Sequence, residues 1–194
     1  ELLESGLVQQ EDAPRFLGHI RRESARLLTL IEDIIHISQL DGEPVLSREQ
    51  VDLLVIAEEV TEALKMAAFH KNIALELEGQ SCTMYGVRNL LHQLVYNLCD
   101  NAIVYNVPGG RVTVRVEKVG GKPVLTVADT GIGIPAAHQD RIFERFYRVD
   151  KSHSRQSGGT GLGLSIVKHA AQYHDAVISL DSAPGKGTTI AITF

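Results

Sequence analysis

The feature that most constrains the fold is a hairpin pattern in the middle of the chain. The segment Arg111-Val-Thr-Val-Arg-Val-Glu117 alternates valine with polar residues, so its valines face one side of a strand. Gly120-Gly121 provides a tight turn, and Val124-Leu-Thr-Val-Ala128 follows as a second strand. The chain is therefore expected to contain a sheet with one apolar face.

Helical and strand patterns alternate around this hairpin. Helices are expected at 52–69, 87–105 and 162–173, the first of them capped by Asp52. The further expected strands are 45–51, 73–77, 82–85, 176–180 and 188–193. The last two form a closing hairpin around Pro184-Gly-Lys-Gly187. This mixture predicts an α/β domain over residues 44–194.

One long helical pattern precedes that domain, over residues 13–40. Its apolar residues recur at spacings of three, four and seven, and the stripe is wide enough to favour a helical bundle. Asp12 can cap this helix and Pro14 suits its first turn. Asp41-Gly-Glu-Pro44 ends it, so residues 1–43 are expected to form a separate helical domain.

Composition and charge exclude several classes of function. The net charge of −5 argues against a general nucleic-acid binder and disfavours a membrane-surface role. Cys82 and Cys99 have no metal-ligand or redox spacing, which is typical of thiols in a reducing cytosol. The sequence shows no apolar run of membrane-spanning length and no signal peptide. Because it opens at Glu1 without a methionine, we expect it to be cut from a longer protein.

The segment Gly158–Ser165, GGTGLGLS, places four glycines directly before a helix. It is not a P-loop, because it has no Gly-Lys-Ser/Thr ending, and it lacks the third glycine of a Rossmann fingerprint. A glycine loop that enters a helix still offers free backbone N–H groups and the positive end of the helix dipole. The segment therefore indicates either a phosphate site or the hinge of a lid.

Three other groups could bind parts of a nucleotide. Asp129 ends an apolar strand and is followed by Thr-Gly-Ile-Gly, so it is either a turn cap or an acceptor for an exocyclic amine. Asn97 and Asn101 share a helix face, where they are either a buried amide pair or ligands of Mg²⁺ beside phosphates. Arg148 is the candidate for a bidentate phosphate contact.

Five segments, in this order, resemble the N, G1, F, G2 and G3 boxes of bacterial sensor histidine kinases: NLCDNAIVYN, DTGIGIP, FERFYRVD, GGTGLGL and GKGTT. The resemblance implies a two-layer α/β sandwich of the histidine-kinase and gyrase type, with a mixed sheet and helices. It implies ATP beneath a mobile lid, which matches the irregular segment 144–160. The helix at 13–40 resembles the second helix of the dimerisation and phosphotransfer hairpin.

The resemblance also implies roles for particular residues. Asn97 and Asn101 would hold Mg²⁺ and the phosphates, and Arg148 would contact the phosphates during catalysis. Asp129 would accept from the adenine amine. The other implied nucleotide-binding residues are Tyr105, Gly131, Gly133, Gly159, Gly161, Gly163, Leu164 and Thr188.

The sequence departs from the family pattern at two places. Val104 stands where the N box usually has Lys or Arg, which removes one phosphate contact and predicts low affinity or turnover. Asp175-Ala176 stands where Gly-Gly usually follows the histidine after the last helix; because Asp can adopt a left-handed cap, little effect is expected.

The implied function is transfer of the ATP γ-phosphate to a histidine and then to an aspartate of a response regulator. In the family, the acceptor histidine is followed by Glu or Asp and soon after by Pro, and none of the eight histidines here has that pattern. The acceptor is therefore expected before Glu1, and this fragment is expected not to phosphorylate itself. The resemblance further implies a cytoplasmic core, a homodimer through the hairpin, and membrane attachment only through other segments. Two alternatives stay open: a nucleotide-binding pseudokinase or scaffold, and an ATP hydrolase, which would need a carboxylate where Gln93 stands.

Overall fold

The computed structural model describes residues 47–149 and 160–194, together with residues 12, 14–18, 20, 21, 24 and 27. Residues 14–18 are helical, and the carbonyl of Asp12 accepts from the N–H groups of Arg15 and Phe16 at 3.0 and 3.2 Å. Residues 20, 21, 24 and 27 are helical too, whereas the other residues of the predicted helix at 13–40, and the expected domain boundary at 41–44, lie outside the described residues.

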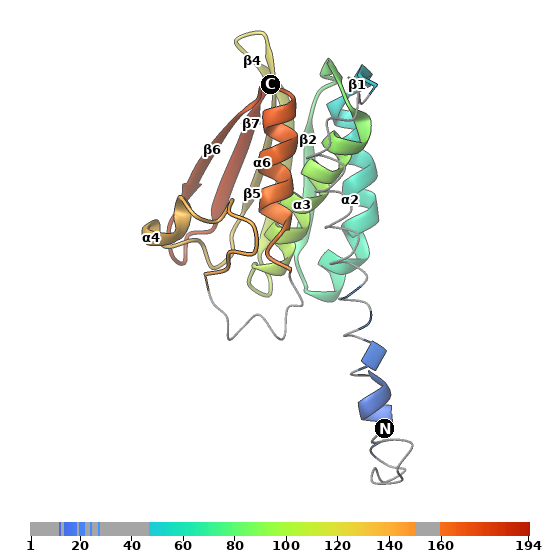
Figure 1. Cartoon of the computed structure of the whole chain (residues 1–194), viewed down its shortest axis with the longest axis vertical. Helices are drawn as coiled ribbons and strands as arrows, with labels where there is room; N and C mark the ends of the chain where they lie inside the picture. Colours follow the sequence, from blue (N-terminus) through green and yellow to red (C-terminus); the bar gives the residue numbers. More distant parts are fainter. Residues whose placement is uncertain are drawn as a thin grey trace.

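Five strands form one mixed sheet in the order β2-β4-β5-β7-β6 (Figure 1). They are β2 (Ala74–Gly79), β4 (Arg111–Val119), β5 (Lys122–Asp129), β6 (Val177–Ser182) and β7 (Thr188–Thr193). β2 and β4 are parallel, whereas every other neighbouring pair is antiparallel. The alternating valines 112, 114 and 116 are fully buried, so the predicted apolar face of the hairpin is confirmed.

Three helices form the second layer of the sandwich. They are α2 (Leu53–His70), α3 (Arg88–Val104) and α6 (Gly163–Tyr173), and α3 lies between the other two (Figure 1). Their apolar faces share one core with the inner face of the sheet, so the predicted two-layer α/β sandwich is confirmed. None of the helices described is both long and apolar enough to cross a bilayer.

Asp52 fixes the start of α2, as the sequence predicts. Its carboxylate accepts from the N–H groups of Leu54 and Cys82, both at 3.0 Å, and from the Ser81 hydroxyl at 2.6 Å. Asp52 ends β1 (Glu49–Asp52), which pairs with β3 (Thr83–Gly86) in a separate two-stranded sheet. Of the strand predicted at 45–51, residues 45 and 46 lie outside the described residues, residues 47 and 48 precede β1, and the last three belong to it. The short helix α4 (Ala136–Gln139) was not predicted because one turn carries no periodicity.

His174 ties the far end of α6 to the start of α3. Its Nε2 accepts from the N–H of Val87 at 3.0 Å, and its Nδ1 donates to the carbonyl of Ala170 at 2.7 Å. The next residue, Asp175, has φ +54°, so the predicted left-handed cap without glycine is confirmed. α6 is therefore held at this end while its first residue lies at the other end, beside α3.

Candidate functional site

The central groups of the candidate site are two asparagines on α3. The Nδ2 of Asn97 donates to the carbonyl of Gln93 at 2.8 Å, and the Nδ2 of Asn101 donates to the carbonyl of Asn97 at 2.7 Å. Each amide thus uses its nitrogen within the helix, and its oxygen is the atom that can bind a ligand. Amide oxygens are suitable ligands for a hard cation such as Mg²⁺.

The first residue of α6 lies directly against these asparagines. A β-carbon on Gly163 would stand 2.7 Å from Oδ1 of Asn97 and 3.3 Å from Nδ2 of Asn101. The N-terminal end of α6, with its backbone N–H groups and partial positive charge, therefore faces the two amides. This end is anchored in the core by Leu162, which is fully buried. Two elements far apart in the sequence thus form one place suited to an anion and its counter-ion.

Asp129 forms the other end of the site. It is the last residue of β5 and pairs with Thr188 in β7. Its carboxylate accepts from the N–H of Gly131 at 2.7 Å and from the backbone of Thr188. Burial raises the pKa of Asp129, and these two hydrogen bonds oppose the rise. The result is a half-buried acceptor at the C-terminal end of the central strand of the sheet.

The glycines near Asp129 show how tightly its loop packs. A β-carbon on Gly131 would stand 2.4 Å from the carbonyl oxygen of Tyr105 and 2.8 Å from Oδ1 of Asp129. The same Tyr105 carbonyl accepts from Ile132 N–H at 3.1 Å, which joins the end of α3 to this loop. Gly133, with φ +67°, packs instead against the backbone of Ala183. Gly131 and Tyr105 thus lie beside Asp129, whereas Gly133 shapes the turn below it.

Arg148 and Gly161 meet on the α6 side of the site. A β-carbon on Gly161 would stand 3.3 Å from Cγ of Arg148, and the Gly161 carbonyl accepts from the N–H of Phe146 at 2.9 Å. Both Phe146 and Gly161 have positive φ, at +64° and +76°. Leu164 packs against the core. Gly159 and the larger part of the predicted lid lie outside the described residues.

Several polar residues at the site escaped the sequence reasoning. The Ser182 hydroxyl lies 2.9 Å from Oγ1 of Thr188 and also contacts the backbone of Ile134 and Gly187. Burial raises the pKa of Asp100 on α3, and the ammonium of Lys71 opposes that rise. Serine, aspartate and lysine are common at surfaces, so nothing in their local sequence distinguishes these three.

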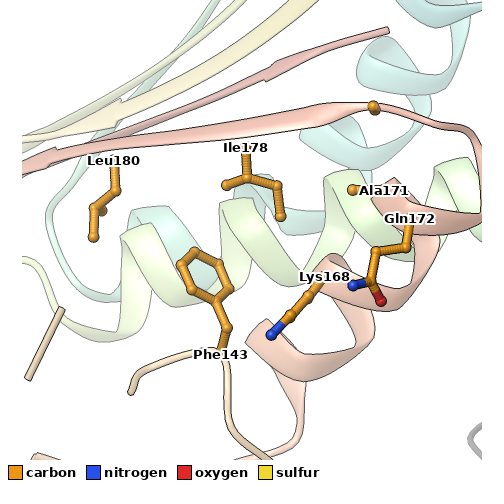
Figure 2. Close-up of a pocket in the computed structure, with 7 residues that line it drawn as sticks. Phe143, Lys168, Ala171, Gln172, Ile178 and Leu180 are labelled. Atoms are coloured by element: carbon orange, nitrogen blue, oxygen red, sulfur yellow. The ribbon is translucent and has the colours of Figure 1, made fainter. Parts of the chain in front are cut away.

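A cavity of about 290 Å³ lies elsewhere, between α6, β6 and Phe143. In Figure 2 the Phe143 ring points toward Ile178 and Leu180, with the Lys168 side chain beside it. None of the predicted site residues lines this cavity. The polar groups described above, rather than this apolar hollow, therefore define the candidate site.

Comparison with known proteins identifies what this arrangement is similar to. Residues 86–194, more than half of the chain, match the family model described as histidine kinase-, DNA gyrase B-, and HSP90-like ATPase. The sensor-like histidine kinase SenX3 of Mycolicibacterium smegmatis is 38% identical over 198 aligned residues, covering 99% of this chain and 52% of SenX3. The chain thus spans about half the length of the curated relatives it first matches.

Solved structures give the same result for the fold. The mycobacterial sensor histidine kinase MprB has a TM-score of 0.67 and 31% identity, covering 76% of this chain and 97% of that one. The histidine kinase ThkA, in complex with the response regulator protein TrrA, has a TM-score of 0.77 over 98% of this chain and 53% of that one. At 22% identity, the second likeness concerns the fold alone.

Proposed function

Since the chain belongs to the histidine kinase-, DNA gyrase B- and HSP90-like ATPase family, we propose that it binds Mg·ATP as the catalytic part of a sensor histidine kinase. It transfers the γ-phosphate to a histidine outside these 194 residues, from which the phosphate passes to a response-regulator aspartate. The single observation that carries this proposal is the contact of Gly163 with Asn97, which sets the amide oxygen of Asn97 against the N-terminus of α6, with the Asn101 amide beside it.

The two ends of the site match the two ends of ATP. Asp129 accepts a hydrogen bond from the adenine amine, while the neighbouring backbone at Gly131 lets the flat ring approach closely. Tyr105 borders the base, and Gly133 and Thr188 support the Asp129 loop. This assignment places the base where burial and hydrogen bonds hold a fixed acceptor.

The phosphates lie toward α6 in this proposal. Backbone N–H groups at Gly161, Gly163 and Leu164, together with Gly159, surround them, and Arg148 adds a cation that neutralises the moving charge. Asn97 and Asn101 fit Mg²⁺ because each presents an amide oxygen; the bound ion would supply charge neutralisation between phosphate oxygens. Catalysis of the transfer from ATP is then mainly positioning and charge neutralisation.

The partners follow from the same proposal. ThkA, whose fold this chain shares, is known in complex with the response regulator protein TrrA. We assign this chain a receiver-domain partner of the same kind. Its residues 1–43 form part of the dimerisation and phosphotransfer hairpin, so the complete kinase is a homodimer. Its catalytic part works in the cytoplasm, with any membrane anchor on another segment.

Calorimetry with and without Mg²⁺ tests the site. Asn97→Ala should weaken Mg·ATP far more than metal-free ATP, because it removes a metal ligand. Asp129→Ala should weaken both, because it acts at the base. Equal losses with and without Mg²⁺ for Asn97→Ala would contradict the metal role, and failure of the unmodified chain to bind ATP would contradict the whole proposal.

A nucleotide-binding scaffold is the second candidate, and Val104 is the observation that favours it. Val104 continues the row of Asn97 and Asn101 on α3 but brings no charge to the phosphates. A scaffold would bind ATP and transfer nothing. A phosphotransfer assay on a longer chain that includes the acceptor helix separates the two: labelled histidine supports the kinase, and bound but unreacted ATP supports the scaffold.

A further inference from the structure

The inference concerns the row of side chains on α3 and what lies at its end. At 100° per residue, Asn97, Asn101 and Val104 occupy one face of the helix. Asp100 borders the same face, so the row carries a carboxylate and no cation of its own. An ATP molecule along this face would meet amide oxygens first and then an apolar side chain.

Lys71 brings a positive charge to this point from another helix. It follows the last residue of α2, and its Nζ lies 3.0 Å from the carbonyl oxygen of Val104 and 3.4 Å from that of Ile103. Its charge also reaches Asp100, whose pKa it lowers against the effect of burial. The ammonium therefore lies at the backbone of the residue where α3 lacks a charge.

The charge balance of the site calls for such a group. The chain has a net charge of −5, and the site itself contains the carboxylates of Asp100 and Asp129. Mg·ATP also keeps a net negative charge, so nearby cations are needed to hold it. Arg148 supplies one beside Gly161, on the α6 side. Lys71 lies at the other flank of α3, where it can neutralise the phosphate chain from the opposite direction.

We propose that Lys71 replaces the missing N-box cation: on ATP binding its ammonium leaves the Val104 carbonyl and binds a phosphate oxygen. This rests on the proposed function and deepens it. The exchange costs little free energy, because Lys71 is exposed and water can donate hydrogen bonds to the carbonyls at the end of α3 in its place. A lysine can make it because its four-carbon chain turns freely and its three donors are not fixed in direction.

The test compares nucleotides that share a base but differ in phosphate. Lys71→Met should raise the Kd of Mg·ATP on the order of tenfold, as expected for one lost charge-assisted bond, and leave the Kd of adenosine unchanged. Lys65→Met is the control, because Lys65 is an exposed lysine of α2, the helix that Lys71 follows, and pairs with Glu62 at 3.0 Å. It should change neither Kd.

The double variant Lys71→Met/Val104→Lys distinguishes a phosphate contact from a structural cap. Lysine at 104 should restore ATP affinity without restoring whatever thermal stability Lys71→Met removes. Equal losses of ATP and adenosine, no loss of either, or a folded double variant that remains weak would each overturn the proposal. If the unmodified chain itself fails to bind Mg·ATP, the proposed function fails instead, so the two failures are distinguishable.

Discussion

Gly163 at the start of α6 lies so close to Asn97 on α3 that a residue with a β-carbon does not fit at position 163 unless Asn97 moves. A β-carbon at Gly163 would stand 2.7 Å from Oδ1 of Asn97, closer than β-carbons approach other atoms in proteins. The helix start and the amide oxygen are thereby fixed relative to one another. A ligand that binds beside this pair meets a preformed arrangement.

Gly163→Ala should separate folding from binding. At the first residue of α6 the helix preference of alanine over glycine counts for little, and the added methyl can be accommodated by a shift of the Asn97 side chain, so the thermal stability should change only slightly. The Kd of Mg·ATP should rise at least roughly tenfold, because the added methyl displaces Asn97 and with it the ligand oxygen. Lys168→Ala, an exposed change on the same helix, serves as the control and should leave the Kd unchanged. Unchanged ATP binding in Gly163→Ala would refute this geometry.

The local sequence pattern predicted most of the helices and strands, but not the contacts between residues far apart in the sequence. The spacing of Asn97 and Asn101 placed both on one helix face, and the valine alternation placed three side chains in the core. The parallel pairing of β2 with β4 and the contact of Gly163 with Asn97 could not be predicted, because they join residues far apart in sequence. For Gly133 the motif predicted a contact with the nucleotide, but its backbone packs against Ala183. A glycine in a motif does not by itself show whether it contacts a ligand or another part of the chain.

Asp129 should show a conflict between stability and binding. Its pKa is raised by burial, so the folded state holds this proton more strongly than the unfolded chain. The stability from that proton is present below the unfolded pKa and is lost as pH rises through the folded pKa. At neutral pH the buried carboxylate is therefore a cost, and Asp129→Asn should raise the melting temperature.

The gain from Asp129→Asn should shrink as the pH falls, because the raised pKa lets the native carboxyl take up its proton before that of the unfolded chain does. Adenine nucleotides should bind more weakly, because a charged acceptor is lost. Melting curves at pH 4 and 7, with ATP titrations at pH 7, measure both effects. A variant that is destabilised at pH 7, or that binds ATP more tightly, would contradict the assignment.

His174 should make the fold sensitive to mild acid. Burial lowers its pKa and so does Arg48, while the Ala170 carbonyl and Asp175 oppose the shift. The neutral ring accepts from Val87, which a protonated ring cannot do. Because the pKa of His174 is lower in the folded state, the neutral ring stabilises the fold at pH values above the pKa of the unfolded chain. This stability is lost as the pH falls through the pKa of the folded state. The melting temperature should therefore decline below about pH 6.5.

His174→Gln tests that decline, because glutamine can accept and donate but does not titrate. Its melting temperature should vary less between pH 6.5 and 5 than that of the unmodified chain. His70→Gln, an exposed change at the end of α2, controls for removal of an imidazole as such. An unaltered pH profile in His174→Gln would show that other groups cause the acid sensitivity.

Asp52→Ala should destabilise the fold without touching the site. The carboxylate caps α2 through Leu54 and also holds Cys82 and Ser81 of the turn before β3. Loss of a helix cap lowers the unfolding free energy by about 1–2 kcal/mol. Because Asp52 also makes the contacts with Cys82 and Ser81, its loss should lie at the upper end of that range. Urea denaturation measures it. Asp52→Asn, which keeps an acceptor, should recover part of the loss, and a neutral Asp52→Ala would contradict this account.

The chain should not phosphorylate its own histidines. Transfer requires an imidazole nitrogen in line with the γ-phosphate, and the barrier rises steeply when the two are not held together. His174 is buried with both nitrogens in hydrogen bonds, and Nδ1 of His138 pairs with the Tyr147 hydroxyl at 2.6 Å. Only His174 among the eight histidines is followed by an acid, Asp175, and no proline follows soon after it as in the acceptor pattern.

Incubation with γ-labelled ATP and Mg²⁺ measures this directly. The 194-residue chain should bind nucleotide yet acquire no acid-labile, alkali-stable label, whereas a longer chain that includes the acceptor helix should become labelled under the same conditions. Asn97→Ala in the longer chain should remove that label, because the acceptor would remain while the phosphates lose their positioning. Label on the 194-residue chain at a comparable rate would place the acceptor among its own histidines, and peptide mapping would then identify which one lies within reach of the site.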